Sequence, residues 1–226
     1  MPIRTVLFDL DGTLADTAPD LAFALNEVLV EQGREPLPFE RIRPVVSHGA
    51  LALVRLGFGI GPEDARFAAL RRRLIDIYRD NLTRSTRLFP GMAELLESIE
   101  VRGMRWGVVT NKPAALTEPL MAQLGLTARA AAVISGDTLP VRKPDPAPML
   151  LACEQAQSHP SRCVYVGDAE RDVQAGRNAG MATLVALFGY LDETDRPSDW
   201  GADGMVEHPD EVLPWIAERF QRAEAW

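Results

Sequence analysis

The stretch "VLFDLDGTLADT", residues 6–17, decides the expected fold, because an apolar run ends there in two carboxylates followed by Gly-Thr. The run at 5–8 is short and apolar on both faces, as is typical of a strand buried within a parallel sheet. Residues two apart in extended backbone point to the same side, so Asp9 and Asp11 are expected to face one pocket. Two carboxylates directly after a buried strand indicate that both side chains have a function at this site.

Four similar runs follow, each brief, apolar and bounded by turn-forming residues: 105–110, 131–135, 163–167 and 182–187. Helical patterns with apolar residues at three- and four-residue spacing separate the later runs: 91–103, 113–125, 146–157 and 171–180. This alternation predicts an α/β fold with a doubly wound, parallel, Rossmann-like sheet. Ligands bind such sheets beyond the carboxyl ends of the strands, which is where Asp9, Thr110 and Asp168 fall.

A long segment interrupts this alternation with two amphipathic helical patterns, at 17–33 and 62–82. Thr17 is expected to cap the first helix, and Tyr78 lies on the apolar stripe of the second. The segment is too long for an ordinary connection between a strand and a helix, so we interpret it as an inserted domain. The expected domains are a catalytic core, 1–16 and 86–226, and a helical cap, 17–85.

The composition limits the classes of partner and the cellular compartment that are expected. The chain has 226 residues and a formal net charge of −8, which argues against a nucleic-acid partner but leaves room for a small anionic substrate. Two cysteines, Cys153 and Cys163, fit a reducing compartment and offer no metal-binding spacing. No apolar run approaches about 20 residues, so no membrane span is expected and the protein is predicted to be cytoplasmic. The oligomeric state stays open.

Carboxylates also follow a later strand, where "VGDAERD" supplies Asp168 and Asp172. One Asp at a strand end is ordinarily a turn residue or a helix cap, but acidic clusters after two buried strands point to a shared site. Carboxylates held close together repel one another unless a cation or a proton lies between them. Hard oxygen ligands with few nitrogen or sulfur donors suit Mg²⁺, which is the predicted cofactor.

Other side chains at the strand ends suit an anion. Gly12 allows a tight turn, and Thr13 offers a hydroxyl and an amide. Thr110 and Asn111 are short donors suited to phosphoryl oxygens. Lys143 lies between an arginine and a proline in "VRKPDP", and although a lone lysine is usually a solvated charge, the flanking prolines stiffen this loop. These residues are the predicted phosphate-binding set.

Four of these stretches, in this order, resemble the four motifs of the haloacid dehalogenase superfamily. They are "DLDGT", the Thr of "VVTNK", the Lys of "RKPDP" and "GDAERD". The likeness spans nearly the whole chain, and the helical insert is similar to that superfamily's C1-type cap. The resemblance implies a Mg²⁺-dependent phosphomonoesterase that works through an aspartyl-phosphate on a small phosphorylated metabolite.

The resemblance also implies roles for single residues. Asp9 would be the nucleophile, Asp11 the general acid and then the general base, and Thr110 and Lys143 the stabilisers of phosphate and nucleophile. A carboxylate attacks an anionic phosphate poorly, so Mg²⁺ and Lys143 are needed to neutralise charge. Dehalogenases proper resemble this fold but lack an Asp two residues after the nucleophile, so Asp11 favours phosphoryl chemistry.

The implied metal ligands are Asp9, Asp168 and the main-chain carbonyl of Asp11. Asp172 is expected to support the site through its neighbours, without binding the metal directly.

Within the superfamily, "TAPDL", "VVTNKP" and "FGYLDE" are similar to the phosphoglycolate phosphatase group. A narrower likeness, carried by "WGVVTNKP", "KPDPAPMLLAC" and the tail "DWGADGMVEHP", is to the phosphatases of N-acetylmuramic acid 6-phosphate. We favour the second substrate over 2-phosphoglycolate on the tail and the Trp106 context. Both substrates carry a carboxylate, and His48 in the cap segment "VVSHGALALV" is a candidate to bind it. The alternative for His48 is an exposed loop residue.

Two other classes of protein remain alternatives. A phosphomutase of the same superfamily would share every core motif, although the extra cap residues that such an enzyme needs are not evident in the sequence. A non-enzymatic phospho-receiver domain also uses carboxylates, Thr and Lys around Mg²⁺. Its motif order differs, however, and it has no helical insert.

Overall fold

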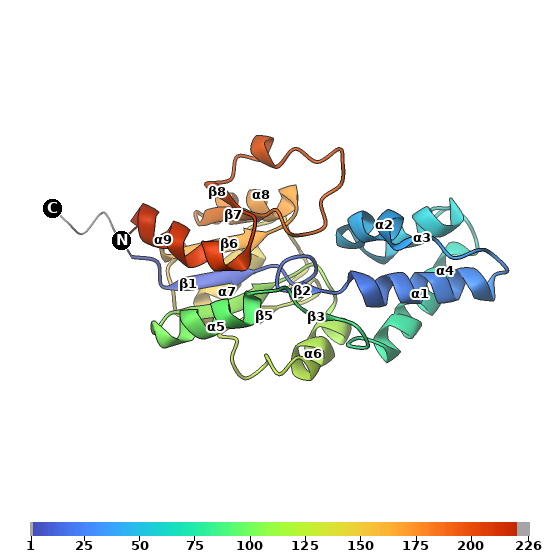
Figure 1. The fold of residues 1–226 in the computed structure, drawn as a ribbon, viewed down its shortest axis with the longest axis horizontal. Coiled ribbons are helices and arrows are strands. Elements are labelled where there is room, and N and C mark those ends of the chain that lie inside the picture. Colours follow the sequence, from blue (N-terminus) through green and yellow to red (C-terminus); the bar gives the residue numbers. More distant parts are fainter. Residues whose placement is uncertain (1, 221–226) are drawn as a thin grey trace.

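The computed structural model describes residues 2–220, and a six-stranded sheet with strand order β5-β4-β1-β6-β7-β8 forms its centre (Figure 1). The strands are β1 (Thr5–Phe8), β4 (Arg105–Val109), β5 (Val133–Ile134), β6 (Cys163–Gly167), β7 (Ala182–Ala186) and β8 (Gly204–Val206). Every pairing in this sheet is parallel. The parallel sheet expected from the apolar runs is therefore confirmed.

Helices cover both faces of the sheet, as a doubly wound fold requires. They are α5 (Met92–Val101), α6 (Ala114–Gln123), α7 (Ala147–Gln155), α8 (Glu170–Asn178) and α9 (Val212–Phe220). Val6 and Phe8 of β1 pack in one apolar cluster with side chains of α5, α6 and α9. Leu7 lies on the opposite face and packs with side chains of α7 and α8. Both faces of β1 are buried, which is why its sequence is apolar throughout.

Each strand and helix predicted for the core lies within two residues of its observed bounds, but the core also contains helix α9, which was not predicted. Strand β8 was not predicted, and it falls inside the tail "DWGADGMVEHP". It is an edge strand paired only with β7, and just Val206 of its three residues is buried. An apolar run therefore does not mark it. The tail that suggested the muramate branch is thus part of the sheet.

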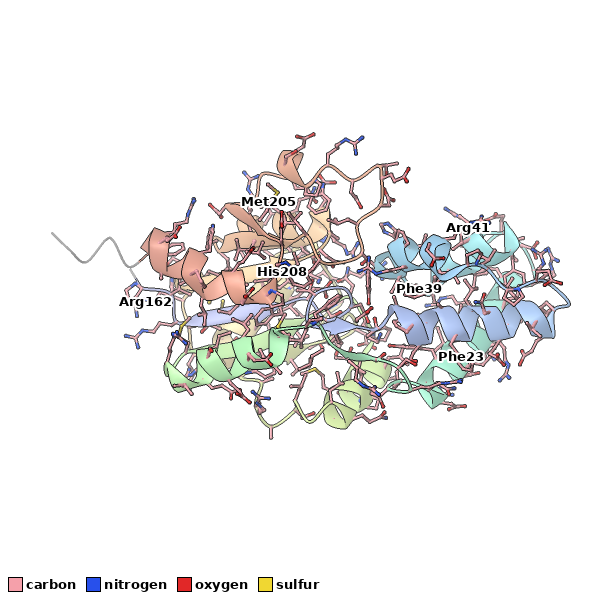
Figure 2. All side chains as sticks on the ribbon, viewed as in Figure 1. Phe23, Phe39, Arg41, Arg162, Met205 and His208 are labelled. Atoms are coloured by element: carbon pink, nitrogen blue, oxygen red, sulfur yellow. The ribbon has the colours of Figure 1, made fainter. Side chains whose placement is uncertain are left out.

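The helical insert contains α1 (Ala18–Glu31), α2 (Phe39–Ile42), α3 (Gly49–Phe58) and α4 (Phe67–Asp80). It lies beyond the carboxyl ends of the strands, to the right in Figure 1. Side chains occupy the space between the insert and the sheet (Figure 2), and one apolar cluster of buried side chains includes residues from both. No helix among residues 2–220 is both long and apolar enough to cross a membrane.

The chain leaves and re-enters the core through a short antiparallel pair, β2 (Ala15–Asp16) with β3 (Arg87–Leu88). The domain boundaries expected from the sequence fall beside this pair.

Two details of the insert differ from expectation. Thr17 precedes α1, but its side chain makes no capping hydrogen bond and donates to Asp11 Oδ1 instead, at 2.6 Å. Helix α4 begins at Phe67, later than the expected start at 62. The carboxylate of Asp64 accepts the Arg66 N–H at 2.9 Å, and this local turn delays the helix. The stripe that includes Tyr78 is buried as expected.

Candidate active site

The turn after β1 places Asp9 at the centre of the site. The Asp9 N–H donates to the Val166 carbonyl at 2.9 Å, which extends the β1–β6 pairing by one residue. Its Oδ1 accepts the Leu10 N–H at 2.7 Å. Gly12 has a φ of +84°, and a Cβ at this position would lie 2.1 Å from Asp168 Oδ2. Only glycine therefore allows the turn to approach the second acidic segment so closely.

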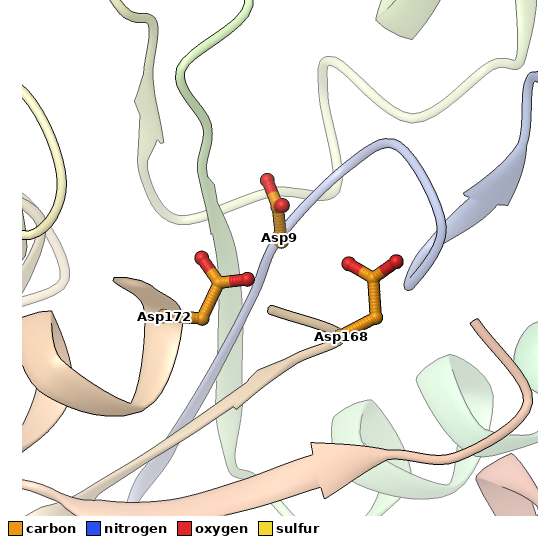
Figure 3. A group of neighbouring side chains, drawn as sticks. All are labelled: Asp9, Asp168 and Asp172. Carbon is orange, nitrogen blue, oxygen red and sulfur yellow. The ribbon is translucent and has the colours of Figure 1, made fainter. Parts of the chain in front are cut away.

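Three buried carboxylates, Asp9, Asp168 and Asp172, converge so that one oxygen from each lies within 4.8 Å of the others (Figure 3). Burial, together with the negative charges of Asp9 and Asp172, raises the pKa of Asp168 to about 7. Burial likewise raises the pKa of Asp172, against the opposing effect of Lys143. The excess of negative charge in a buried place makes this cluster fit for a cation.

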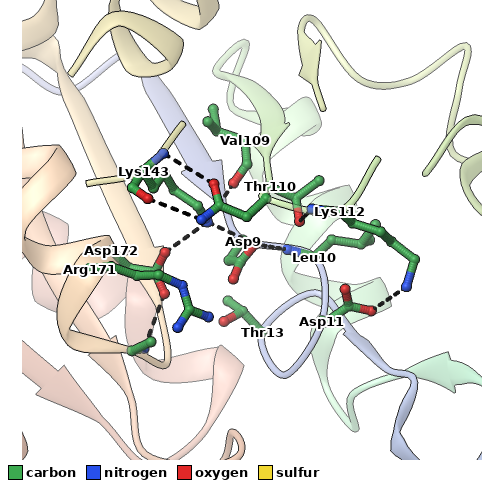
Figure 4. A network of polar contacts seen from close by, with 12 residues as sticks. Asp9, Leu10, Asp11, Thr13, Val109, Thr110, Lys112, Lys143, Arg171 and Asp172 are labelled. Carbon is green, nitrogen blue, oxygen red and sulfur yellow. Dashed lines mark hydrogen bonds and ion pairs between the residues drawn. The ribbon is translucent and has the colours of Figure 1, made fainter. Parts of the chain in front are cut away.

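Lys143 supplies part of the neutralising charge (Figure 4). Its Nζ lies 2.9 Å from Asp9 Oδ1 and 2.7 Å from Asp172 Oδ1. It also donates to the Val109 carbonyl at 2.9 Å and to the Tyr165 hydroxyl at 2.8 Å. The side chain is 1% exposed, so this lysine is not the solvated charge that a lone lysine usually is. Its position next to Asp9 is the one that the motif predicted.

The predicted phosphate-binding residues surround the same point. The side-chain amide of Asn111 makes two hydrogen bonds with the backbone of Lys143. Asn111 Nδ2 donates to the Lys143 carbonyl at 3.0 Å, and the Lys143 N–H donates to Asn111 Oδ1 at 3.1 Å. Asn111 therefore fixes the lysine loop, and a direct contact with phosphate stays a prediction. The Thr110 hydroxyl accepts the Lys112 N–H at 3.2 Å, and the Thr13 hydroxyl donates to Asp168 Oδ1 at 3.4 Å.

Asp11 lies beside this cluster and has its own partners. Its Oδ1 accepts from Thr17 Oγ1 at 2.6 Å and from Lys112 Nζ at 2.8 Å. Lys112 Nζ also donates to the Tyr78 hydroxyl at 2.8 Å. Sequence reasoning assigned no role to Lys112, although it follows Thr110 by two positions. It placed Tyr78 on an apolar stripe, and no local signal marks a contact between residues so far apart in the chain.

The structure does not bring His48 to the carboxylates. The side chain of His48 is exposed and makes no hydrogen bond with any residue in the described range. Its neighbour Ser47 reaches the site instead, because Ser47 Oγ donates to Asp168 Oδ2 at 2.9 Å. The Arg171 guanidinium donates to the Ser47 carbonyl at 2.9 Å. The "SHG" segment therefore meets the site through Ser47, and binding of a substrate carboxylate by His48 stays a prediction.

Tyr190 from "FGYLDE" is a further residue that sequence reasoning did not place. Its N–H donates to Asp168 Oδ2 at 2.9 Å, and its hydroxyl donates to Asp16 Oδ1 at 2.7 Å. One residue thus holds Asp168 and the strand that leads into the insert.

Comparisons with known proteins agree on one family. Residues 6–186 match the family model described as haloacid dehalogenase-like hydrolase. An N-acetylmuramic acid 6-phosphate phosphatase from Pseudomonas putida is 44% identical over 212 residues, which cover 94% of this chain and 95% of the relative. A phosphoglycolate phosphatase from Xylella fastidiosa is 43% identical over 208 residues, which cover 91% of this chain and 90% of the relative.

A solved structure shows the same fold. The crystal structure of a predicted phosphoglycolate phosphatase from Haemophilus somnus matches with a TM-score of 0.83 at 26% identity and covers 94% of this chain and 97% of that chain. The chain belongs to the haloacid dehalogenase-like hydrolase family. The resemblance carried by the motifs is confirmed, and the expected enzyme class, phosphoric monoester hydrolase, is the class of these relatives.

Proposed function

We propose that the protein is a Mg²⁺-dependent phosphomonoesterase that transfers the phosphoryl group to Asp9 and then to water. The arrangement of Asp9 carries this proposal. Its Oδ1 is held by the Leu10 N–H and by Lys143 Nζ, whereas Oδ2 has no hydrogen-bond or ion-pair partner among residues 2–220. A carboxylate fixed through one oxygen presents the other as an oriented nucleophile.

The donor set fits Mg²⁺, because the buried cluster offers only oxygen ligands. Asp172 pairs with Lys143 Nζ at 2.7 Å, whereas Asp168 has no cationic side chain at ion-pair distance among residues 2–220. As the motif resemblance implies, the proposed ligands are Asp9, Asp168 and the main-chain carbonyl of Asp11, and Asp172 keeps Lys143 in place. Bound Mg²⁺ would neutralise the negative charge that gathers on the phosphoryl oxygens.

The residues around Asp9 account for both halves of the reaction. Asp9 Oδ2 forms a bond to phosphorus while the bond to the leaving oxygen breaks, and Asp11 gives that oxygen a proton. Asp11 then takes a proton from water as the water oxygen bonds to phosphorus and the bond to Asp9 breaks. Lys143 and Thr110 stabilise the phosphoryl oxygens in both steps.

The substrate we propose is a small phosphorylated acid or sugar, with N-acetylmuramic acid 6-phosphate first and 2-phosphoglycolate as the alternative. Relatives with these two names are 44% and 43% identical to the chain, so overall identity supports both about equally. Both compounds offer a carboxylate to the insert. His48 remains the proposed partner for that carboxylate, with Ser47 nearer to the catalytic carboxylates.

The test is phosphate release from both compounds, compared by kcat/KM, with the Asp9→Asn variant as the control. We expect the wild-type enzyme to hydrolyse one of them with Mg²⁺ and the variant to lose turnover. Variant activity within about tenfold of the wild type, equivalent to only about 1.4 kcal/mol of activation free energy, would exclude Asp9 as the nucleophile.

The same assay separates the alternatives. Turnover that requires a bisphosphorylated sugar and yields an isomer, without phosphate release, would identify a phosphomutase. Membership of the hydrolase family removes the receiver-domain alternative.

A further inference from the structure

We propose that Lys112 is a positioning residue for the Asp11 carboxylate and that Tyr78 couples this positioning to the helical insert. Asp11 is then set for proton transfer only when the insert is seated on the core. The inference rests on the proposed function, in which Asp11 exchanges a proton with the leaving oxygen.

The two oxygens of the Asp11 carboxylate differ in their partners. Oδ1 accepts two donors, Thr17 Oγ1 at 2.6 Å and Lys112 Nζ at 2.8 Å. Oδ2 has no hydrogen-bond or ion-pair partner within the described part of the chain. Two donors on one oxygen fix the plane of the carboxylate, and charge-assisted hydrogen bonds are the stronger kind. The geometry therefore leaves Oδ2 as the atom that carries the exchangeable proton.

Lys112 is itself held in place by burial and by backbone hydrogen bonds. Its side chain is 5% exposed, so the ammonium is held inside the protein. Its carbonyl accepts from Thr117 Oγ1 at 3.1 Å and from the Gly136 N–H at 2.8 Å. Its N–H donates to the Thr110 hydroxyl at 3.2 Å. Because the backbone is fixed at the end of β4, the ammonium reaches Asp11 from a rigid base.

Helix α4 of the insert contacts Lys112 through Tyr78. Tyr78 belongs to α4, is 1% exposed, and accepts from Lys112 Nζ at 2.8 Å through its hydroxyl. The ammonium also lies 4.5 Å from the centre of the Tyr78 ring, which is within range of a cation–π interaction. Figure 4 shows Lys112 reaching across to Asp11. Tyr78 contacts the same ammonium from the insert.

Both donors to Asp11 Oδ1 thus depend on where the insert sits. Thr17 is the residue before α1, and Lys112 is covered by α4 through Tyr78. Moving the insert away would expose the ammonium to water, where its attraction to Asp11 is weaker. It would also displace the hydroxyl of Thr17. The Asp11 carboxylate is therefore oriented when the insert packs against the core.

The dependence of the rate on the leaving group distinguishes a positioning role of Lys112 from a merely structural one. Lys112→Met and Tyr78→Phe are compared in single-turnover phosphorylation of Asp9 with nitrophenyl phosphate and with whichever acid phosphate the enzyme hydrolyses. Nitrophenolate leaves without a proton, whereas an alkyl oxygen needs one from Asp11. Arg71→Met, on the exposed face of α4, is the matched control for loss of a cation.

We expect Lys112→Met to slow the reaction of the alkyl phosphate by about tenfold more than that of nitrophenyl phosphate, because general-acid assistance is worth at least that much. Tyr78→Phe should show a smaller loss in the same direction, and Arg71→Met none. Equal losses on both substrates, or no loss, would overturn the proposal for Lys112. An inert wild-type enzyme would instead contradict the proposed function.

The coupling to the insert has a test that does not require activity. Tyr78→Phe keeps the buried ring and removes only the hydroxyl that accepts from Lys112. Hydrogen exchange of the amides in α4 should be faster in this variant than in the wild type, and unchanged in Arg71→Met outside the substituted position. Identical exchange in Tyr78→Phe and wild type would show that Lys112 does not hold the insert.

Discussion

At the scale of single residues, the site is a balance between one ammonium and three carboxylates. Lys143 lies between Asp9 and Asp172, and Asp168 is left without a cationic side chain at ion-pair distance among residues 2–220. A buried charge without a partner of opposite sign is strongly destabilising. The protein therefore holds Asp168 in a place where ionisation is unfavourable until a cation binds.

This imbalance predicts how stability depends on pH in the metal-free protein. The pKa of Asp168 is raised to about 7 in the folded state. A folded-state pKa above the unfolded value means that the folded protein binds the proton more tightly, so stability falls as pH rises from about 4 to about 7. Asp168→Asn removes the ionisable group. It should raise Tm at about pH 8, where the native carboxylate is ionised, and have much less effect at about pH 5.

Differential scanning calorimetry with EDTA at both pH values measures this, with the exposed Glu97→Gln as the matched change from carboxylate to amide. Glu97→Gln should leave Tm nearly unchanged. A loss of Tm in Asp168→Asn at the higher pH would show that Asp168 stabilises the metal-free fold, contrary to this account.

The residues that the sequence did indicate share one property. Asp9, Thr110, Lys143 and Asp168 each follow a strand or lie in a proline-braced loop, so local pattern and motif order suffice to find them. Tyr78 and the other partners that were missed make contacts between distant segments, such as Tyr78 with Lys112 and Ser47 with Asp168. A sequence without aligned relatives carries no local signal for such contacts.

At the scale of elements, the carboxyl ends of β1, β4 and β6 bring the site together, because these strands are neighbours in the sheet. Their apolar runs made the sheet predictable, since each is buried on both faces. Strand β8 was not predictable in this way because only one of its residues is buried. The start of α4 was displaced by a side-chain hydrogen bond in the Asp64 turn.

The segment before α3 gives the prediction that belongs to this scale. If His48 binds the carboxylate of the substrate, His48→Ala should reduce kcat/KM for the acid phosphate by about tenfold or more, as for loss of one charge-assisted hydrogen bond. Hydrolysis of nitrophenyl phosphate, which has no carboxylate, should change much less. Steady-state kinetics on both compounds decide this. Unchanged kinetics would leave His48 as an exposed loop residue, and equal losses would indicate a folding defect in the insert.

At the scale of the whole molecule, the insert covers the carboxyl ends of the sheet (Figure 1), and the proposed metal site lies between two segments of the core. The "DLDGT" turn supplies Asp9, and the segment after β6 supplies Asp168. Tyr190 and Ser47 reach Asp168 from two further directions. The proposed metal site, the insert and the segment after β7 are therefore in contact with one another.

We expect activity to depend on a metal, and substitutions of Asp168 and Asp172 to change this dependence differently. EDTA should stop turnover and Mg²⁺ should restore it. Asp168→Asn should raise the Mg²⁺ concentration needed for half-maximal activity by about tenfold or more, because one of few protein ligands is lost. Asp172→Asn should lower kcat through Lys143 with a smaller effect on Mg²⁺. Full activity in a sample shown to be metal-free would contradict the assignment, as would equal Mg²⁺ shifts in the two variants.

Phosphoryl transfer to Asp9 can be measured directly in the Asp11→Asn variant. Nitrophenyl phosphate can phosphorylate this variant without an acid, but the base needed to activate water for the second step is missing. The intermediate should therefore accumulate. Peptide mass spectrometry after an acid quench should find one added phosphoryl group on the peptide that contains Asp9. Release of nitrophenol with no phosphoryl group on the protein, or with the group on another residue, would contradict the account.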